Sequence, residues 1–312
     1  MKIFVAGATG AIGRPLIAQL LEQGHEIVAL TRSLEKAQTL AKQGVELAIA
    51  DVFDADAVKA AMTRTQPEVV IEQLTSLPKT YTSESMSAAS ALNTRIRREG
   101  GANVLAAAQG AGVRRYLRQS IAFWAIPGAG LADEETPLAF DASPAVAADA
   151  HIVTEIERDL LGNPNLEGIA VRYGFLYGPG TWFAPDGDVA QQVRQQQFPI
   201  VGNGEGVWSW IHIEDAAIAT VAAAERGNSG IYLITDDQPV AVRQWLPAYA
   251  KWLNAPPPPQ VSVEDALRIS GADAVYYGTQ MRGASNAKAK RELNFQPRPL
   301  EWMVNSAVAH TS

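Results

Sequence analysis

The sequence predicts an α/β protein with a doubly wound parallel sheet and a smaller C-terminal lobe. An apolar run, Ile3 to Ala6, enters a glycine-rich turn that is followed by an amphipathic segment. Apolar and amphipathic segments then alternate at short intervals as far as Tyr173, which is typical of a parallel sheet covered by helices on both faces. Beyond Tyr173 the spacing becomes irregular, and Gly, Pro and Asp become frequent.

The alternating part predicts six strands and five helices. The strands are expected at 3–6, 26–31, 45–50, 68–74, 115–119 and 168–173, and the helices at 14–23, 34–43, 55–63, 86–111 and 146–161. Later segments indicate strands at 208–213 and 231–235, a helix at 214–224, and short helices at 285–293 and 300–308. The sheet domain therefore covers 1–175, with 208–235 returning to it, and the lobe covers 176–207 and 236–312.

The turn after the first strand reads G-A-T-G-A-I-G. Gly7 permits a sharp turn, Gly10 lets a pyrophosphate approach the backbone, and Gly13 lets the following helix pack closely on the strand. Phosphates would bind the free N–H groups at the helix start, where the helix dipole favours negative charge. We therefore interpret residues 1–175 as a dinucleotide-binding domain of the Rossmann type, and the lobe as the substrate-binding part.

Composition excludes several other classes of site. The net charge of 26 − 33 = −7 does not favour nucleic acid or an anionic membrane as a partner. The basic cluster of Arg95, Arg97 and Arg98 is therefore expected to be a solvated helix face. The absence of cysteine excludes disulfides and thiolate chemistry. No metal site is expected, because the four histidines (His25, His151, His212 and His310) lie far apart.

The N-terminus carries no secretory signal, because Lys2 leads directly into the first strand. No apolar run is long enough to span a bilayer. We therefore expect a cytoplasmic protein.

Several segments, in this order, resemble the extended NAD-dependent epimerase/dehydratase branch of the short-chain dehydrogenase/reductase superfamily. They are the glycine turn, Asp51-Val52, R-R-Y-L-R-Q-S (114–120), D-E-E-T-P-L (133–138), R-Y-G-F-L-Y-G-P-G (172–180), W-I-H-I-E-D-A-A (210–217) and N-A-K-A-K-R-E-L (286–293). The resemblance implies a nicotinamide cofactor whose adenine lies beside Asp51 and Val52. The alternative for Asp51 is that it caps the helix that follows.

The end of the second strand favours NADP(H) over NAD. Thr31 stands where the family members that use NAD carry an acid, which would repel a 2′-phosphate. Arg32 follows it and Arg14 follows the last glycine, so two guanidinium groups are available for one phosphate. The alternative is a solvated Arg32 and an Arg14 paired with a surface acid. The expected cofactor contacts are Gly7, Thr9, Gly10, Ala11, Ile12, Gly13, Arg14, Thr31, Arg32, Asp51, Val52, Leu74 and Tyr173.

The catalytic pair usual in this family, a Tyr with a Lys four residues later, is missing. No Tyr lies between Tyr116 and Tyr173, and no Lys lies between Lys79 and Lys251. If Glu155 marks the helix register, Ala147 and His151 occupy the two places; if Ser143-Pro144 marks it, Ala145 and Asp149 do. We favour the first register, because it keeps a polar group where the Lys belongs.

The first register makes His151 the leading proton donor, since histidine exchanges protons near neutral pH. A helix-surface or core histidine is the alternative. Ser120 ends the fifth strand and is the candidate for a hydrogen bond to a substrate carbonyl. The serine usual in the family often lies one or two positions later, at Ile121 or Ala122 here.

Ligands of doubly wound folds bind beyond the C-terminal strand ends. The loops that reach this edge suggest an aromatic pocket for a small-molecule substrate, although some of its members would instead pack the lobe onto the sheet. The expected pocket residues are Tyr81, Phe123, Trp124, Trp182 and Trp210.

We expect an NADP(H)-dependent oxidoreductase that passes hydride to a carbonyl or activated double bond. The alternatives are a nucleotide-sugar epimerase/dehydratase, whose diphosphate would need Arg243 or Arg282, and a non-catalytic NADP(H) sensor resembling NmrA-like regulators. A homodimer through the helices at 86–111 and 145–161 is also expected, because alanines would allow close packing there or within the monomer.

Overall fold

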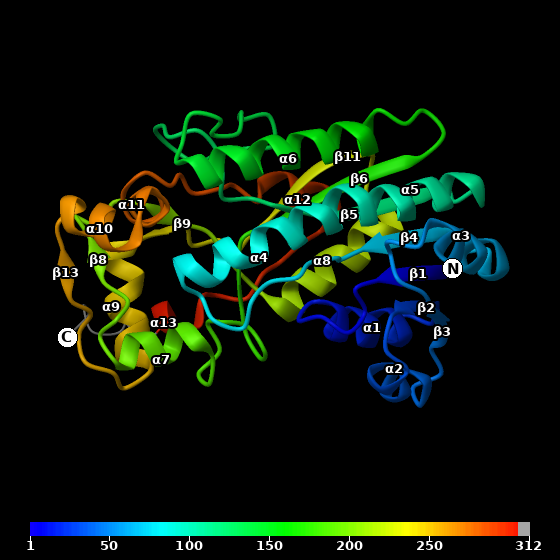
Figure 1. The fold of residues 1–312 in the computed structure, drawn as a ribbon, viewed down its shortest axis with the longest axis horizontal. Helices are drawn as coiled ribbons and strands as arrows, with labels where there is room; N and C mark the ends of the chain where they lie inside the picture. Colours follow the sequence, from blue (N-terminus) through cyan, green and yellow to red (C-terminus); the bar gives the residue numbers. More distant parts are fainter. Residues whose placement is uncertain (305–312) are drawn as a thin grey trace.

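The computed structural model describes residues 1–304, without the side chains of Leu34 and Lys36, and confirms the predicted fold class. All seven strands of the main sheet are parallel, in the order β11-β6-β5-β4-β1-β2-β3 (Figure 1). The strands are β1 (Lys2–Ala6), β2 (Glu26–Thr31), β3 (Glu46–Ile49), β4 (Val69–Glu72), β5 (Arg115–Ile121), β6 (Glu167–Tyr173) and β11 (Gly230–Ile234). The predicted strands agree with these to within a few residues, and the late strand at 231–235 joins the sheet as its edge strand β11.

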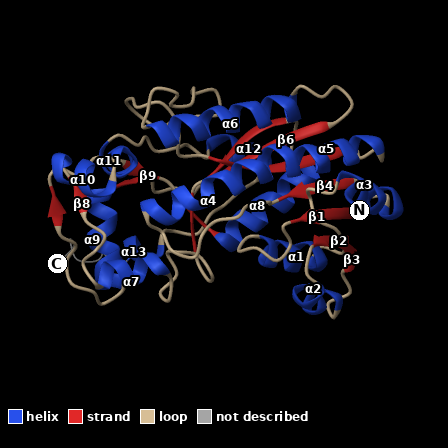
Figure 2. Ribbon diagram, viewed as in Figure 1, coloured by secondary structure: helices blue, strands red, loops and turns tan. Residues whose placement is uncertain are grey.

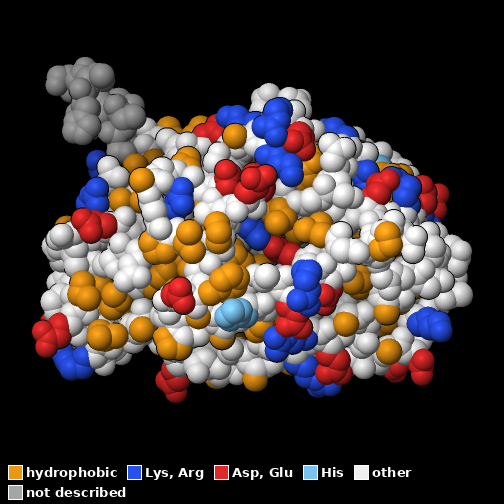
Figure 3. All heavy atoms as spheres, turned by 90° about the horizontal axis from the view of Figure 1, so that it is seen from above, with side chains coloured by type: hydrophobic (Ala, Val, Ile, Leu, Met, Phe, Trp, Pro, Cys, Tyr) orange, Lys and Arg blue, Asp and Glu red, His pale blue; other side chains and the backbone are white. Residues whose placement is uncertain are grey.

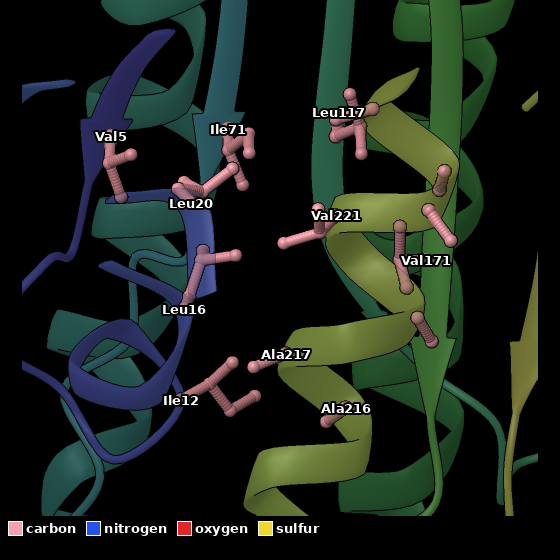
Figure 4. Packing of buried hydrophobic residues seen from close by; sticks show 14 of the residues in the cluster. Val5, Ile12, Leu16, Leu20, Ile71, Leu117, Val171, Ala216, Ala217 and Val221 are labelled. Atoms are coloured by element: carbon pink, nitrogen blue, oxygen red, sulfur yellow. The ribbon is translucent and has the colours of Figure 1, made fainter. Parts of the chain in front are cut away.

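Helices cover both faces of this sheet (Figure 2). Helix α1 (Gly13–Glu22) and helix α8 (Ile213–Arg226) pack on one face, where Leu16, Leu20 and Val221 meet the strand side chains (Figure 4). Helices α3 (Ala55–Thr65), α5 (Gly101–Gly110) and α6 (Pro144–Leu161) contribute to the apolar cluster on the other face. Helix α2 (Leu34–Ala41) connects β2 to β3. This two-sided burial explains why the strands read as continuous apolar runs.

The helix predicted at 86–111 consists of three consecutive helical segments. Helix α4 (Ser83–Arg95) continues through a π-helical turn, η1 (Ile96–Gly100), into α5. The two glycines at the junction lie so close to other side chains that a larger residue would collide with them. A Cβ on Gly100 would lie 2.9 Å from Val52, and one on Gly101 would overlap the Arg118 guanidinium. A π-helical turn inserts one residue and redirects the side chains around it, and such turns are frequent at functional sites.

The lobe lies at the opposite end of the molecule from β1–β3 (Figure 1). Three short strand pairs hold it together: β7 (Phe175–Tyr177) with β10 (Trp210–His212), β9 (Val207–Trp208) with β12 (Val240–Ala241), and β8 (Ile200–Val201) with β13 (Gln260–Val261). The strand predicted at 208–213 is thus divided at Ser209 between two pairings. The lobe helices are α7 (Asp188–Arg194), α9 (Val242–Trp252), α10 (Val263–Ser270), α11 (Ala272–Thr279) and α13 (Glu301–Val304). The rest of the predicted helix at 300–308 lies outside the described residues.

Helix α12 (Ala287–Leu293) packs against α8 and β11, so this late segment belongs spatially with the sheet domain.

The alanines expected at a dimer interface differ in burial. Ala107 and Ala108 of α5 are buried within the monomer, whereas Ala88 and Ala91 of α4 are exposed. The homodimer therefore stays a prediction. Among residues 1–304, no helix combines the length and apolarity needed to cross a bilayer.

Candidate functional site

The glycine turn between β1 and α1 contains two glycines that the fold requires and one that is left open to a ligand. Gly7 has φ +93°, and a Cβ there would lie 2.4 Å from the Gln73 carbonyl oxygen. A Cβ on Gly13 would lie 2.2 Å from the Gly7 carbonyl oxygen. Gly10 is exposed, and its nearest neighbour would be the Gly7 oxygen at 3.3 Å. The fold therefore requires Gly7 and Gly13, whereas Gly10 keeps the outer surface of the turn open.

The start of α1 fits an anionic ligand. Ile12 is the N-cap residue and provides no side-chain acceptor, and the first turn contains no acid. Thr9 and Ala11 are partly exposed beside Gly10. Helix N-termini without such caps leave N–H groups for phosphate oxygens. The turn thus matches the pyrophosphate of a dinucleotide, the group that would bind over Gly10.

At the adenosine end, Arg32 remains largely available. Its side chain is 68% exposed, and its Nη1 lies 3.9 Å from an oxygen of Asp51. Thr31 is buried, and its hydroxyl oxygen accepts a hydrogen bond from the Ser33 backbone. Asp54, not Asp51, caps α3, so the alternative interpretation of Asp51 as a helix cap is wrong.

The other expected cofactor residues lie in different surroundings. Arg14 is exposed beside Gly180 and forms no ion pair with a residue in the described range, so Arg14 and Arg32 have separate neighbours. Val52 is buried under Gly100. Leu74 lines a small pocket at the end of β4. The ring of Tyr173 is buried in the core, and its hydroxyl is hydrogen-bonded to Thr220 and Gln73.

Ser120 is held inside the sheet–helix interface. Its hydroxyl donates to an oxygen of Glu157 on α6 at 2.5 Å. Glu157 also accepts two hydrogen bonds from Arg172, at 2.8 and 2.6 Å, and all three side chains are buried. Because the Ser120 hydroxyl proton is donated to Glu157, Ser120 would have to exchange this partner to reach a substrate carbonyl. Ile121 lines the small pocket, and Ala122 is buried.

Helix α6 presents Asp149, rather than His151, toward the strand ends. His151 is exposed and stacks on Phe140, with ring centroids 4.6 Å apart. Asp149 is partly buried, and one of its oxygens lies 3.8 Å from Arg97 of η1. Burial raises the pKa of Asp149, while the Arg97 charge opposes this shift. The second register, with Ala145 and Asp149 in the Tyr and Lys places, therefore agrees better with the geometry. His151 remains a prediction.

Arg97 does not lie on the solvated helix face that the sequence predicted. Its side chain is only 13% exposed, whereas Arg98 is 49% exposed and paired with Glu155. Burial lowers the pKa of Arg97, and the Asp149 carboxylate opposes this. The prediction is thus wrong for Arg97, because the π-helical turn points this side chain inward.

Aromatic rings surround this edge. Tyr81 packs on Trp182 with ring centroids 4.8 Å apart, and Phe123 stacks on Phe175 at 4.2 Å. Hydrophobic side chains also gather near the lobe end of the face shown in Figure 3. Trp210 is fully buried against Trp245 in the lobe core, so it packs the lobe instead of lining a pocket.

Sequence reasoning missed Tyr277 of α11. Its hydroxyl oxygen accepts a hydrogen bond from Nε1 of Trp124 at 2.9 Å, and its own proton has no acceptor among residues 1–304. Burial raises the pKa of Tyr277 well above its usual value, with the nearby Tyr81 as a further cause. The hydroxyl therefore stays protonated and available as a donor. No sequence signal marked it, because it lies in a segment without a recognisable motif.

Within the described part of the chain, no group of three or more His, Asp or Glu side chains could hold a metal ion. At this edge Arg97 interacts electrostatically with Asp149 and Tyr277, and Tyr277 also interacts with Tyr81.

Comparison with known proteins agrees with this architecture. A family model described as the NAD dependent epimerase/dehydratase family matches residues 3–235. The chain belongs to this family. A UDP-glucose 4-epimerase from Thermus thermophilus, solved with NAD, shares the fold with a TM-score of 0.70 and 20% identity, over 99% of this chain and 98% of that one.

Two curated relatives carry the names of reductases. The chain is 41% identical to a "3-diazoavenalumate denitrifying reductase" of Streptomyces sp, over 97% of this chain and 98% of that protein. It is 30% identical to a "4-hydroxy-2-methyl-3-oxo-4-farnesyl-3,4-dihydroquinoline-1-oxide ketoreductase" of Stigmatella aurantiaca, over 79% of this chain and 71% of that protein. The chain is therefore an enzyme of the NAD(P)-binding oxidoreductase class.

Proposed function

We propose that the protein is an NADP(H)-dependent reductase that passes hydride to an electron-poor group of an aromatic small molecule. The observation that carries this proposal is the uncommitted Tyr277 hydroxyl in an aromatic setting next to Phe123 and Trp124. The bound nicotinamide would supply the hydride. The residues of this chain would hold the acceptor and place a proton donor beside it.

For a carbonyl or an activated double bond, hydride adds to carbon and a proton must reach the other end of the bond. Tyr277 is the donor that compensates for the missing tyrosine of α6. The neighbouring tyrosine differs, because the Tyr276 hydroxyl donates to the Ala125 carbonyl. Tyr276 is therefore a matched control.

Aryl diazo compounds are a second acceptor class, suggested by the name of the Streptomyces relative. When hydride replaces the nitrogen of an aryl diazonium ion, dinitrogen leaves and no proton is needed at the acceptor. A reaction of this kind would proceed without the Tyr and Lys of α6. The missing pair therefore favours this class as well.

NADP(H) is proposed over NAD because Arg32 is 68% exposed at the end of β2, while Thr31 replaces an acid. A guanidinium at this place binds a 2′-phosphate, whereas a carboxylate repels it. Asp51 lies within 3.9 Å of Arg32 and would have to share it with the phosphate.

The nucleotide-sugar alternative finds little support in the lobe. Arg282, one of two arginines available for a diphosphate, donates hydrogen bonds to the carbonyl oxygens of Ala129, Gly130 and Leu131. These bonds use its Nε and Nη2 groups to fasten a loop, which leaves fewer donors for a diphosphate.

The test is a fluorescence titration with NADPH and NADH, followed by a panel of aromatic ketones, enones and aryl diazonium salts. Each assay includes a control without enzyme. We expect tighter binding of NADPH and its oxidation by at least one class. Tyr277→Phe should slow ketone or enone reduction about 100- to 10,000-fold, with little effect on diazonium reduction or on the cofactor Kd. Tyr276→Phe should leave all rates near wild type. Tight binding with no oxidation by any acceptor would support the sensor alternative instead.

A further inference from the structure

We propose that Arg97 binds a carboxylate group of the substrate, so that the preferred substrates are aromatic carboxylates. This inference deepens the reductase function proposed above and rests on it. The residue comes from the basic cluster Arg95, Arg97 and Arg98, which the cofactor motif does not explain.

Arg97 is the member of this cluster without a carboxylate at hydrogen-bond distance. Arg95 forms an ion pair with Glu99 at 2.6 Å, and Arg98 forms one with Glu155. Both are about half exposed, as expected of solvated charges. The Arg97 side chain is 13% exposed, and no residue among 1–304 accepts a hydrogen bond from it. Its nearest carboxylate, Asp149, is 3.8 Å away.

A buried network fixes the backbone that carries Arg97. Nη2 of Arg118 donates to the Arg97 carbonyl oxygen and lies 3.3 Å from Glu72 Oε1. Tyr116 donates to the other oxygen of Glu72 at 2.5 Å. Gly101 leaves the space that the Arg118 guanidinium fills. The π-helical turn is thus stabilised from the sheet side, and it holds Arg97 at the strand ends.

The pocket beside Arg97 has both polar and apolar walls. It lies at the ends of β4 and β5, and its other lining residues are polar (Glu72, Thr75, Arg118, Gln119 and Ser120) and apolar (Leu74, Ile121, Val153 and Ile156). The Arg97 guanidinium carries five N–H donors. One carboxylate at 3.8 Å leaves most of these donors without an acceptor. A guanidinium fork matches a carboxylate in a bidentate arrangement.

The test compares the binding of cinnamate and cinnamamide, two aromatic probes that differ in charge. Quenching of tryptophan fluorescence reports binding, since Trp124 contacts Tyr277. Proteins are wild type, Arg97→Gln, Arg97→Lys and the matched control Arg98→Gln. Each is tested with and without saturating NADPH, and its fold is checked by circular dichroism.

We expect wild type and Arg98→Gln to bind cinnamate about 10- to 100-fold more tightly than cinnamamide, as for a hydrogen bond to a charged group. Arg97→Gln should lose this preference while keeping its affinity for NADPH. Arg97→Lys should retain part of it, because a lysine keeps the charge and loses the fork.

Equal binding of the two probes by wild type, or an unchanged preference in Arg97→Gln, would overturn the inference. If Arg97→Gln does not fold, the wild-type comparison and Arg97→Lys decide. The measurement requires no hydride transfer. A failure of the reductase proposal would appear as absent NADPH oxidation, which is a separate result.

Discussion

Replacing Gly101 by alanine tests the buried network behind the π-helical turn. A Cβ at this position would lie 1.7 Å from Nη2 of Arg118 and 2.9 Å from Oε1 of Glu72. Neither side chain can move toward solvent, since both are about 95% buried or more. The guanidinium must therefore leave its place, and the Arg97 carbonyl loses its donor.

The expected loss of stability follows from two opposing effects. Breaking a buried ion pair so that a charge is left without its partner destabilises by about 3–5 kcal/mol. Replacing a helical glycine by alanine stabilises by about 1 kcal/mol. The free energy of unfolding of Gly101→Ala should therefore fall by about 2–4 kcal/mol.

Urea denaturation followed by circular dichroism measures this change, with Gly110→Ala as the control. Gly110 lies at the end of the same helix, and a Cβ there would meet nothing within 4 Å. Gly110→Ala should be neutral or slightly stabilising. If Gly101→Ala is as stable as Gly110→Ala, the guanidinium does not occupy the space beside Gly101, and the account of how Arg97 is positioned fails.

Three further predictions use other parts of the chain. Arg32→Ala should weaken NADPH binding by about 1–3 kcal/mol and NADH binding much less, as measured by fluorescence titration; equal losses would show that Arg32 does not contact the phosphate. Gly10→Ala should lower the melting temperature much less than Gly13→Ala but lose cofactor affinity about tenfold or more, because its Cβ would lie 3.3 Å from the Gly7 oxygen and that of Gly13 2.2 Å. Burial raises the pKa of Asp236 to about 7 from 3.8, so the folded protein keeps a proton that the unfolded chain releases, and stability should fall as the pH rises from 4 to 7. Asp236→Asn should remove this fall and stabilise the protein at pH 8 by up to about 4 kcal/mol in urea denaturation, and an unchanged pH profile would contradict the assignment.

The sheet domain was predictable because its signals are local. Each strand buried on both faces is a short apolar run, and each helix between strands shows one apolar stripe. Strand β2 and the start of α3 coincide with the predicted positions. The glycine turn was equally readable, since Gly7 and Gly13 are required by contacts within a few residues or with the adjacent strand.

The lobe was less predictable because its order comes from contacts between distant segments. Strands of two or three residues, such as β8 and β13, have too little sequence for a pattern. Helix α9 was missed although its apolar stripe is clear, because Pro247 lies inside it. Its Trp245 packs on Trp210, which sequence reasoning placed in a pocket.

The charges at the strand ends show why the site itself required the structure. In the register that places Asp149 where the family carries a lysine, the charge at that position is reversed. A carboxylate alone in this partly buried place would repel the electron-rich groups of a cofactor or substrate. Arg97 approaches it to 3.8 Å from another helix and offsets its charge. The positive charge that a family lysine would place on α6 is thus supplied here by Arg97 of η1. No residue pattern marks the π-helical turn, so the inward orientation of Arg97 could be seen only in the structure.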